Sequence, residues 1–328
     1  MVAEVKTALS GWVRTQWEAL LIRAGLEPDD RTEQTVLLWD GDALVAAGSR
    51  QGNLLKCIAV DPDRRGEDLT AAVLTQLRME AFREGYRHLF LYTKPANRRL
   101  FQGLFFYPVV HTEAVALLED RQDGIQSFLQ SLPKAPRAKT VGAAVMNCNP
   151  FTRGHRYLIE TAARECEQVY VFVLSEDKSR FSPADRLEMV RRGTRDLPNV
   201  TVLPTGPYLI SSATFPTYFL KDREQAPQIH CKLDIALFGK YFVPHFGITH
   251  RYVGTEPLSP MTESYNRTLE ALLPGYGVQL RQLPRLEVEQ GPVSASRVRA
   301  LLEAGEDIRQ LVPDTTYEYL TQGGNHHG

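Results

Sequence analysis

The chain has 328 residues, of which 43% are hydrophobic and 23% charged, and its formal net charge is -1. This composition is ordinary for a globular protein, and the near-zero charge excludes the broad basic field that binds nucleic acids or anionic lipids without specificity. No stretch reaches the roughly 20 consecutive apolar residues that span a bilayer, and the N-terminus lacks the pattern of a secretory leader. The four cysteines form no Cys-x₂-Cys pair, so we expect reduced thiols in a cytoplasmic protein.

The length favours two domains, since one domain takes about 100 to 200 residues. A segment with two prolines and three basic residues, Leu132 to Thr140, is typical of a linker. We therefore predict a first domain at 1–132, a linker at 133–140 and a second domain at 141–322. Residues 323–328 form a tail that we leave out of the functional interpretation.

The first domain has a mixed α/β pattern. Two apolar runs, Thr35 to Trp39 and Ala43 to Ala47, flank an Asp-Gly pair that suits a tight hairpin turn. A strand at Leu54 to Val60 leads through a basic, glycine-containing turn into a helix with an apolar face from Leu69 to Ala81, and a strand follows at His88 to Tyr92.

This first domain resembles the N-acetyltransferase (GNAT-like) family, in which a glycine-containing turn at a helix start binds the pyrophosphate of an acyl-CoA. Gly66 has the matching place, but Glu67 and Asp68 follow it, and like charges oppose binding of a pyrophosphate. A contact with pantetheine or CoA and a role as scaffold or docking domain therefore both stay open.

The second domain alternates strands and helices. We predict strands at Val141 to Met146, Val169 to Leu174, Val200 to Leu203, Arg251 to Val253 and Val278 to Leu283, with helices at Arg156 to Glu165 and Pro183 to Arg195. Strands and helices that alternate at this spacing are typical of a doubly wound, Rossmann-like parallel sheet, whose ligands bind at the carboxyl ends of the strands.

The first candidate motif is the run from Asn147 to His155, where the first of these strands turns into its helix. A helix N-terminus offers unpaired N–H groups and partial positive charge to a phosphate, and Gly154 allows close approach. His155 would donate to a phosphate oxygen as charge develops, with Thr152 beside it. We expect nucleotide contacts from Asn147, Asn149, Pro150, Phe151 and Gly154. An ordinary turn capped by Thr152 is the alternative interpretation.

The second candidate motif is the run from Val293 to Arg299, at the start of another predicted helix. Ser294 is a suitable N-cap, and Ser296, Arg297 and Arg299 could collect phosphate oxygens with it. A capped helix with solvated arginines is the alternative. The two motifs lie about 140 residues apart in one α/β domain, and their joint occurrence favours the phosphate-binding interpretation.

The pair resembles the signatures of the nucleotidyltransferase superfamily, H/T-x-G-H and I-S-S-T-x-I-R. Thr152 to His155 and Val293 to Arg299 stand in the matching places, although Ala295 replaces a serine and Ser296 a threonine. Gly254, Thr255 and Glu256 resemble the superfamily loop that contacts the base or ribose.

Within that superfamily the runs 147–163, 210–222, 237–257 and 284–302 resemble the citrate lyase ligase family, and the likeness extends over residues 35–305. The resemblance implies that acetate is activated with ATP as acetyl-AMP, with release of pyrophosphate. It also implies acetylation of the thiol of the phosphoribosyl-dephospho-CoA group on the acyl carrier subunit of citrate lyase. ATP, acetate and that subunit are then the expected substrates and partner, with no nucleic acid or membrane.

We expect no protein nucleophile, because positioning and charge neutralisation by His155, Arg299, two helix N-termini and Mg²⁺ suffice for this chemistry. Lys221 is a further catalytic candidate, and Arg186 could reach the triphosphate, although either could be a structural side chain. Ser211, Ser212 and Thr214 are weak candidates for an acetate pocket. We predict no metal site built from protein ligands, because the histidines and cysteines lack zinc spacing.

Two other functions use the same motifs. An adenylyltransferase would form a dinucleotide from ATP and a phosphorylated small molecule. A carrier-docking module would keep the nucleotide site without catalysis, although the joint presence of Gly154, His155 and Arg299 argues against it.

Overall fold

The computed structural model describes the chain except residues 177–178, 212–213, 221, 256–259, 289–290 and 323–328, and except the side chains at 260–262 and 322. The contacts divide the chain into two compact units. The first unit is Met1–Gly124 with Pro216–Ile229, and the second unit is Ile125–Phe215 with His230–Gly328. This division differs from the sequence-based ranges at two places. Helix α4 (Gly124–Ser131) falls almost wholly in the second unit, and the segment 216–229 falls in the first.

The first unit is built on a seven-stranded mixed sheet in the order β1-β2-β3-β4-β5-β7-β6. Its strands are β1 (Val2–Lys6), β2 (Gln34–Asp40), β3 (Ala43–Gln51), β4 (Leu54–Val60), β5 (Phe90–Thr93), β6 (Tyr107–His111) and β7 (Ala116–Glu119). The expected hairpin joins β2 and β3 through Gly41, whose φ of +59° suits glycine. In the parallel pair β4 and β5, Leu54 lies opposite Phe90 and Leu55 opposite Leu91.

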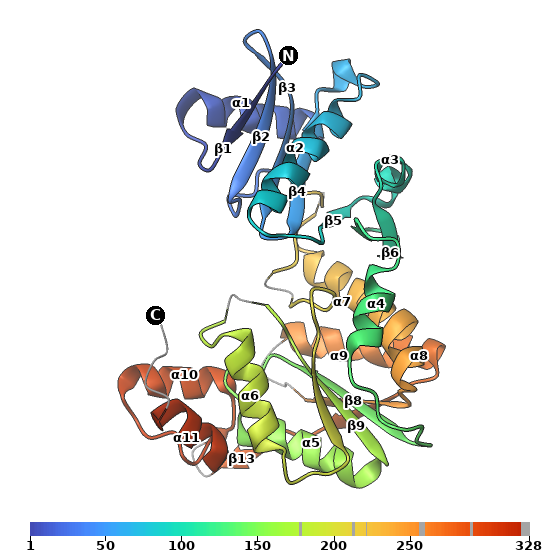
Figure 1. Ribbon diagram of the computed structural model, residues 1–328. Coiled ribbons are helices and arrows are strands. Elements are labelled where there is room, and N and C mark those ends of the chain that lie inside the picture. The colour runs from blue at the N-terminus through green and yellow to red at the C-terminus, as the bar shows by residue number, and fades with distance from the viewer. Residues whose placement is uncertain (177–178, 212–213, 221, 256–259, 289–290, 323–328) are drawn as a thin grey trace. The chain divides into compact units, whose positions relative to one another are not determined.

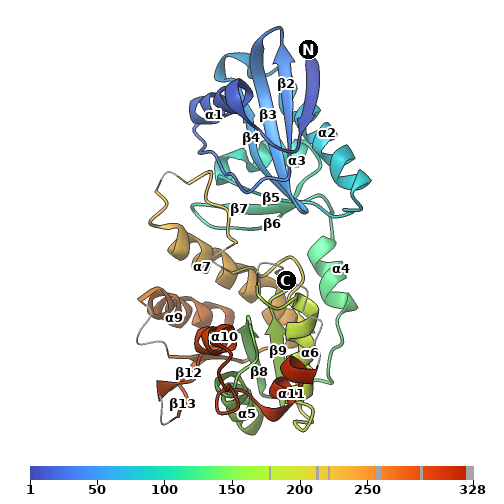
Figure 2. The same ribbon diagram turned by 90° about the vertical axis from the view of Figure 1, so that its left-hand side faces the viewer.

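Three helices accompany this sheet, α1 (Gly11–Arg23), α2 (Leu69–Arg83) and the short α3 (Arg98–Gly103). Val73 and Leu77 of α2 join Val36 of β2 in one apolar core. Figure 2 shows α1 in front of this sheet, and α1 also contacts β3 and β4. The mixed α/β prediction for this part of the chain is confirmed.

The second unit contains the predicted parallel sheet. Its five strands run in the order β10-β9-β8-β11-β12, with all pairs parallel. They are β8 (Val141–Met146), β9 (Gln168–Val173), β10 (Val200–Pro204), β11 (His250–Gly254) and β12 (Gln279–Leu283). The predicted bounds of β8 match, and those of the other four strands differ by one residue at one or both ends.

Helices cover both faces of this sheet (Figure 1). Residues of α5 (Arg153–Glu165) and α6 (Pro183–Gly193) pack with Val171 and Val173 of β9 in one core. Phe172 points to the opposite face, where it meets Phe238, Phe242 and Phe246. That face carries α7 (Ala226–Leu237), the π-helical turn Phe238–Phe242 and α8 (Val243–Phe246), while α9 (Pro260–Leu272) packs on β12.

The strand order has one reversal of direction, between β8 and β11. From β8 the chain moves outward to β9 and β10, and it then returns to β11 and moves outward to β12. In open parallel sheets the loops diverge at such a point and leave a crevice at the carboxyl ends of the strands. Met146 and Gly254, at the carboxyl ends of β8 and β11, border that crevice, so this is where a ligand is expected.

The chain ends with a smaller layer of helices. The strands β13 (Glu287–Val288) and β14 (Gly291–Pro292) precede α10 (Ala295–Ala304) and α11 (Asp314–Gln322). Val293, Val298, Ile308, Leu311 and Val312 form a small core of their own. α11 also contacts α6, which attaches this layer to the helices that cover the sheet.

Candidate nucleotide-binding site

The first motif forms a fixed helix start. Helix α5 begins at Arg153, three residues before the sequence-based estimate, and Thr152 is its N-cap. The Thr152 hydroxyl accepts a hydrogen bond from the His155 backbone N–H at 3.3 Å, and Nδ1 of His155 accepts one from the Thr152 N–H at 3.0 Å. This reciprocal pair is a capping box in which histidine takes the place of the usual glutamate. The orientation of the imidazole is therefore set by the backbone.

The surroundings of His155 keep the ring neutral. Burial disfavours the imidazolium, and the positive charge of Arg285 adds to this effect, so the pKa of His155 is lowered to about 4. In a neutral ring whose Nδ1 accepts a backbone N–H, the proton resides on Nε2. His155 is thus a neutral N–H donor at pH 7, the form suited to binding an anionic oxygen.

The second motif also begins a helix as expected. Ser294 is the N-cap of α10, and its hydroxyl accepts a hydrogen bond from the Arg297 N–H at 3.1 Å. Arg299 lies one turn further along this helix. Its Nη2 donates to Ser296 Oγ at 3.1 Å, and its Nη1 donates to the Asn149 carbonyl oxygen at 2.6 Å.

These contacts bring the two motifs together. A methyl group added at Gly154 would lie 3.5 Å from the backbone oxygen of Val293, and Arg299 bridges to Asn149. The Arg153 N–H further donates to Leu311 O at 2.9 Å. The start of α5 and the start of α10 are therefore neighbours, although about 140 residues separate them in the sequence.

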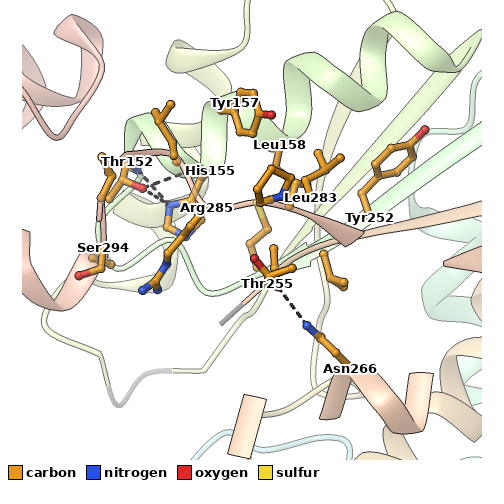
Figure 3. Close-up of a pocket in the computed structure, with 18 of the residues that line it drawn as sticks. Thr152, His155, Tyr157, Leu158, Tyr252, Thr255, Asn266, Leu283, Arg285 and Ser294 are labelled. Carbon is orange, nitrogen blue, oxygen red and sulfur yellow. Dashed lines mark hydrogen bonds between the residues drawn. The ribbon is translucent and has the colours of Figure 1, made fainter. Parts of the chain in front are cut away.

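A cavity of about 270 Å³ lies at this junction (Figure 3). It is bordered by the ends of β8, β11 and β12, through Met146, Gly254 and Leu283, which places it at the reversal of the strand order. Six of the residues expected in the site line it: Thr152, Gly154, His155, Gly254, Thr255 and Ser294.

Seven other expected residues do not line this cavity: Asn147, Asn149, Pro150, Phe151, Ser296, Arg297 and Arg299. Asn149 is buried and its Oδ1 accepts from the Phe181 N–H at 3.2 Å, while its cis peptide bond with Pro150 turns the chain. Phe151 is fully buried, and its ring lies parallel to that of His155 at a centroid distance of 6.0 Å. These residues shape the loop behind the cavity wall.

Arg186 is a fully buried side chain at the same end of the sheet. Its guanidinium donates to the backbone oxygens of Asn147 at 3.0 Å and Leu174 at 2.8 Å, and to that of Glu176. It therefore ties together the loops that follow β8 and β9.

Other candidates are outside the cavity or outside the described residues. Lys221, Glu256 and Ser212 belong to the segments that the structure does not describe. The Ser211 hydroxyl donates to Glu176 Oε2 at 2.8 Å, and the Thr214 hydroxyl donates to Ser211 O at 3.1 Å. Cys148 is 1% exposed, and burial raises the pKa of its thiol, which opposes formation of a thiolate nucleophile.

The two phosphate motifs did not include five polar residues that line the cavity, Tyr157, Tyr252, Tyr265, Asn266 and Arg285. Arg285 lies two residues beyond the carboxyl end of β12, and the convergence of strand ends in a parallel sheet was a signal that could have found it. Asn266 lies in α9, is 5% exposed and donates to Gly254 O at 3.1 Å. No sequence pattern distinguished it.

Two kinds of feature are absent from the part of the chain that the structure describes. Within the described ranges, no three His, Cys, Asp or Glu side chains are grouped so that they could hold a metal ion. Among the same residues, no helix has the length and apolar character needed to cross a membrane.

Comparison with known proteins gives a family match. Residues 141–320 match the citrate lyase ligase C-terminal domain. The chain is 42% identical over 288 residues to the [citrate [pro-3S]-lyase] ligase of Klebsiella pneumoniae, and the match covers 85% of this chain and 84% of that protein. Its identity to the Escherichia coli (strain K12) protein of the same name is 37%, over 90% of this chain and 86% of the other.

Solved structures give weaker likenesses. Pantothenate synthetase from Thermus thermophilus is 16% identical, covers 61% of this chain and 81% of its own, and has a TM-score of 0.34. An acyl-CoA N-acyltransferase from Pseudomonas aeruginosa is 14% identical, covers 37% of this chain and 99% of its own, and has a TM-score of 0.32. These scores are too low to support a conclusion.

Proposed function

This chain belongs to the citrate lyase ligase family, and we propose that it activates acetate with ATP as acetyl-AMP and then transfers the acetyl group to a thiol. The acceptor is the thiol of the phosphoribosyl-dephospho-CoA group on the acyl carrier subunit of citrate lyase. The predicted membership of this family is confirmed by relatives at 35% to 42% identity over most of the chain.

One observation carries the proposal, namely that the starts of α5 and α10 meet at one cavity. Each helix start directs the positive end of its dipole toward this junction, which suits phosphate oxygens. The cavity of about 270 Å³ is open to further groups along its border, where Gly254 and Thr255 supply backbone and hydroxyl contacts for a ribose or base. A nucleotide is therefore the ligand that this cavity suits best.

The reaction has two steps. An oxygen of acetate attacks the α-phosphorus of ATP, the bond from that phosphorus to the oxygen of the β-phosphate breaks, and pyrophosphate leaves. The thiolate of the carrier then attacks the acetyl carbon, the bond from that carbon to the AMP oxygen breaks, and the thiol proton goes to solvent. No protein nucleophile takes part.

His155 is the side chain that acts on the reacting phosphate. Its Nε2–H is fixed in place because Nδ1 is held by the Thr152 N–H. A fixed, neutral donor stabilises the charge that develops on the phosphate oxygens in the transition state without having to reorganise. Thr152 is a positioning residue, since its backbone and hydroxyl contact His155.

Mg²⁺ enters this proposal with ATP. The ion would be coordinated by phosphate oxygens and water, which is its usual preference with nucleotides. Its contribution is to neutralise phosphate charge during attack.

The test is mass measurement of a thiol-bearing citrate lyase carrier after incubation with the protein, Mg²⁺, ATP and acetate. A gain of one acetyl group supports the proposal. ATP–pyrophosphate exchange is measured in parallel with acetate, nicotinamide mononucleotide and phosphopantetheine. Exchange that depends on a phosphorylated partner instead of acetate would support an adenylyltransferase, and ATP binding without exchange for any acid would support a docking module.

A further inference from the structure

Two arginines near the candidate site, Arg285 and Arg299, differ in whether they border the cavity. Arg299, the residue that the second motif assigns to phosphate, donates from Nη1 to the Asn149 carbonyl at 2.6 Å and from Nη2 to Ser296. It does not border the cavity. Arg285 does border the cavity, although no motif included it.

We propose that Arg285 binds the triphosphate in the cavity, whereas Arg299 holds the two helix starts together. This inference rests on the proposed function to the extent that ATP is the ligand. It adds a binding residue that the motifs did not contain, and it gives Arg299 a positioning role.

The charge of the cavity lining supports Arg285. Among the described residues that line the cavity, Arg285 is the one with a full charge at neutral pH, because the lining is otherwise apolar, hydroxyl, amide or glycine and His155 is neutral. A bound triphosphate has several negative charges, which need a cation as well as N–H dipoles in a site removed from water. Guanidinium, with its planar set of donors, fits two phosphate oxygens at once.

The position of Arg285 supports the same role. It lies two residues beyond the carboxyl end of β12, at the edge where the loops of β8 and β11 converge. Figure 3 shows its side chain beside His155 in the cavity. The effect of its charge on the His155 ring agrees with a guanidinium that is close to the imidazole. One phosphate group can therefore contact both side chains.

Calorimetric titration of the full chain with ATP and with adenosine, both in the presence of Mg²⁺, tests the assignment. Arg285→Met should weaken ATP binding by about ten- to a hundredfold, the scale of a lost charged hydrogen bond, and leave adenosine binding unchanged. Arg285→Lys should recover part of the ATP affinity, because it restores the charge without the bidentate geometry. Arg281→Met is the matched control, since Arg281 is an exposed residue of β12, the strand that precedes Arg285, and lies outside the cavity.

Unchanged adenosine binding shows that a variant is folded, and Arg285→Gln replaces Arg285→Met if the latter does not fold. Neutral variants that bind ATP as tightly as the wild type would overturn the inference and leave the proposed function intact. A wild type that binds no ATP would overturn both. ATP binding that depends on Arg285, without acetate-dependent exchange, would support the inference and contradict the proposed function.

Discussion

The starts of α5 and α2 are two versions of one local arrangement, a strand followed by a turn and a helix with a glycine near the helix start, Gly154 within the first turn of α5 and Gly66 before α2. At α5, the Thr152 side chain caps the helix, and His155 is fixed by the same cap. At α2, the N-cap Asp68 has a left-handed φ of +54° and makes no side-chain cap hydrogen bond. The turn before it contains Gly66, with a φ of +94°.

The two helix starts also differ in charge. The α5 cavity is bordered by a neutral histidine and by Arg285. The α2 start borders a cavity of about 540 Å³ in the first unit, and its charged lining residues are Asp68 and the basic residues Arg64, Arg65 and Lys94. Arg64 pairs with Glu67 at 2.6 Å and with Asp40 at 2.9 Å. A glycine near a helix start is therefore insufficient evidence for a phosphate site, since the side-chain cap present at α5 is absent at α2.

From the comparison of the two helix starts, we expect the largest loss of activity when His155 is replaced. His155→Ala should lower acetate-dependent ATP–pyrophosphate exchange by about 10² or more, because a preorganised donor to the transition state is lost. Initial rates at saturating ATP measure the effect. His111→Ala, at an exposed residue of the first unit, is the control. Full turnover by His155→Ala would contradict the catalytic role that we assign to His155 at the start of α5.

The second prediction concerns pH and stability. The pKa of His155 in the folded chain, about 4, is below the value of about 6.5 expected after unfolding, so the unfolded chain binds more protons between these pH values. Stability should therefore fall with decreasing pH in this window, by up to about 2 kcal/mol between pH 7 and pH 5. Urea unfolding at both pH values measures the loss. His155→Gln should lose less than the wild type, and an equal loss would contradict the assignment.

A smaller effect is expected at Arg299. Arg299→Met leaves the Asn149 carbonyl without its 2.6 Å partner and should destabilise the second unit by about 1.5 kcal/mol. The midpoint of urea unfolding is the measurement, with Arg191→Met, at an exposed residue of α6, as control. If Arg299→Met weakens ATP binding at unchanged stability, Arg299 contacts the nucleotide and does not act through the loop.

The smallest effect is expected at the α2 start. Asp68→Asn removes one of the two acidic groups there, and it should change ATP–pyrophosphate exchange by less than about twofold, because Asp68 is exposed and outside the α5 cavity. Exchange rates of the full chain measure this. A large loss would mean that the two helix starts serve the same half-reaction.

Local sequence signals predicted the elements that local chemistry determines. The strands 54–60 and 141–146, the hairpin at Gly41 and the Ser294 cap agree with the structure. The estimate for α5 began three residues late, because the pattern of apolar residues starts after the polar first turn that Thr152 caps. Helix α1, with Trp17, Leu20 and Leu21 buried, lay in a stretch for which we made no prediction.

The arrangement of the candidate site depends on tertiary contacts between segments far apart in the sequence. The two motifs predicted that the loops at Gly154 and Ser294 would share a site, and they do line one cavity. The separate roles of Arg285 and Arg299 depend on which guanidinium reaches Asn149, a contact across 150 positions that no spacing rule encodes. The cofactor-binding and catalytic assignments remain predictions for the experiments above.

The segment 216–229 has a practical consequence for dissecting the protein. Tyr218 is buried in the first unit, donates its hydroxyl hydrogen to Tyr92 O at 2.7 Å and accepts at its backbone oxygen from the Glu27 N–H at 2.8 Å. A truncated fragment ending at residue 132 would lack this tyrosine, and a fragment starting at residue 141 would carry its phenol without the surface that covers it. Either fragment expressed alone would therefore lack part of its packing. Loss of activity in such a fragment would result from this disrupted packing and would not identify catalytic residues.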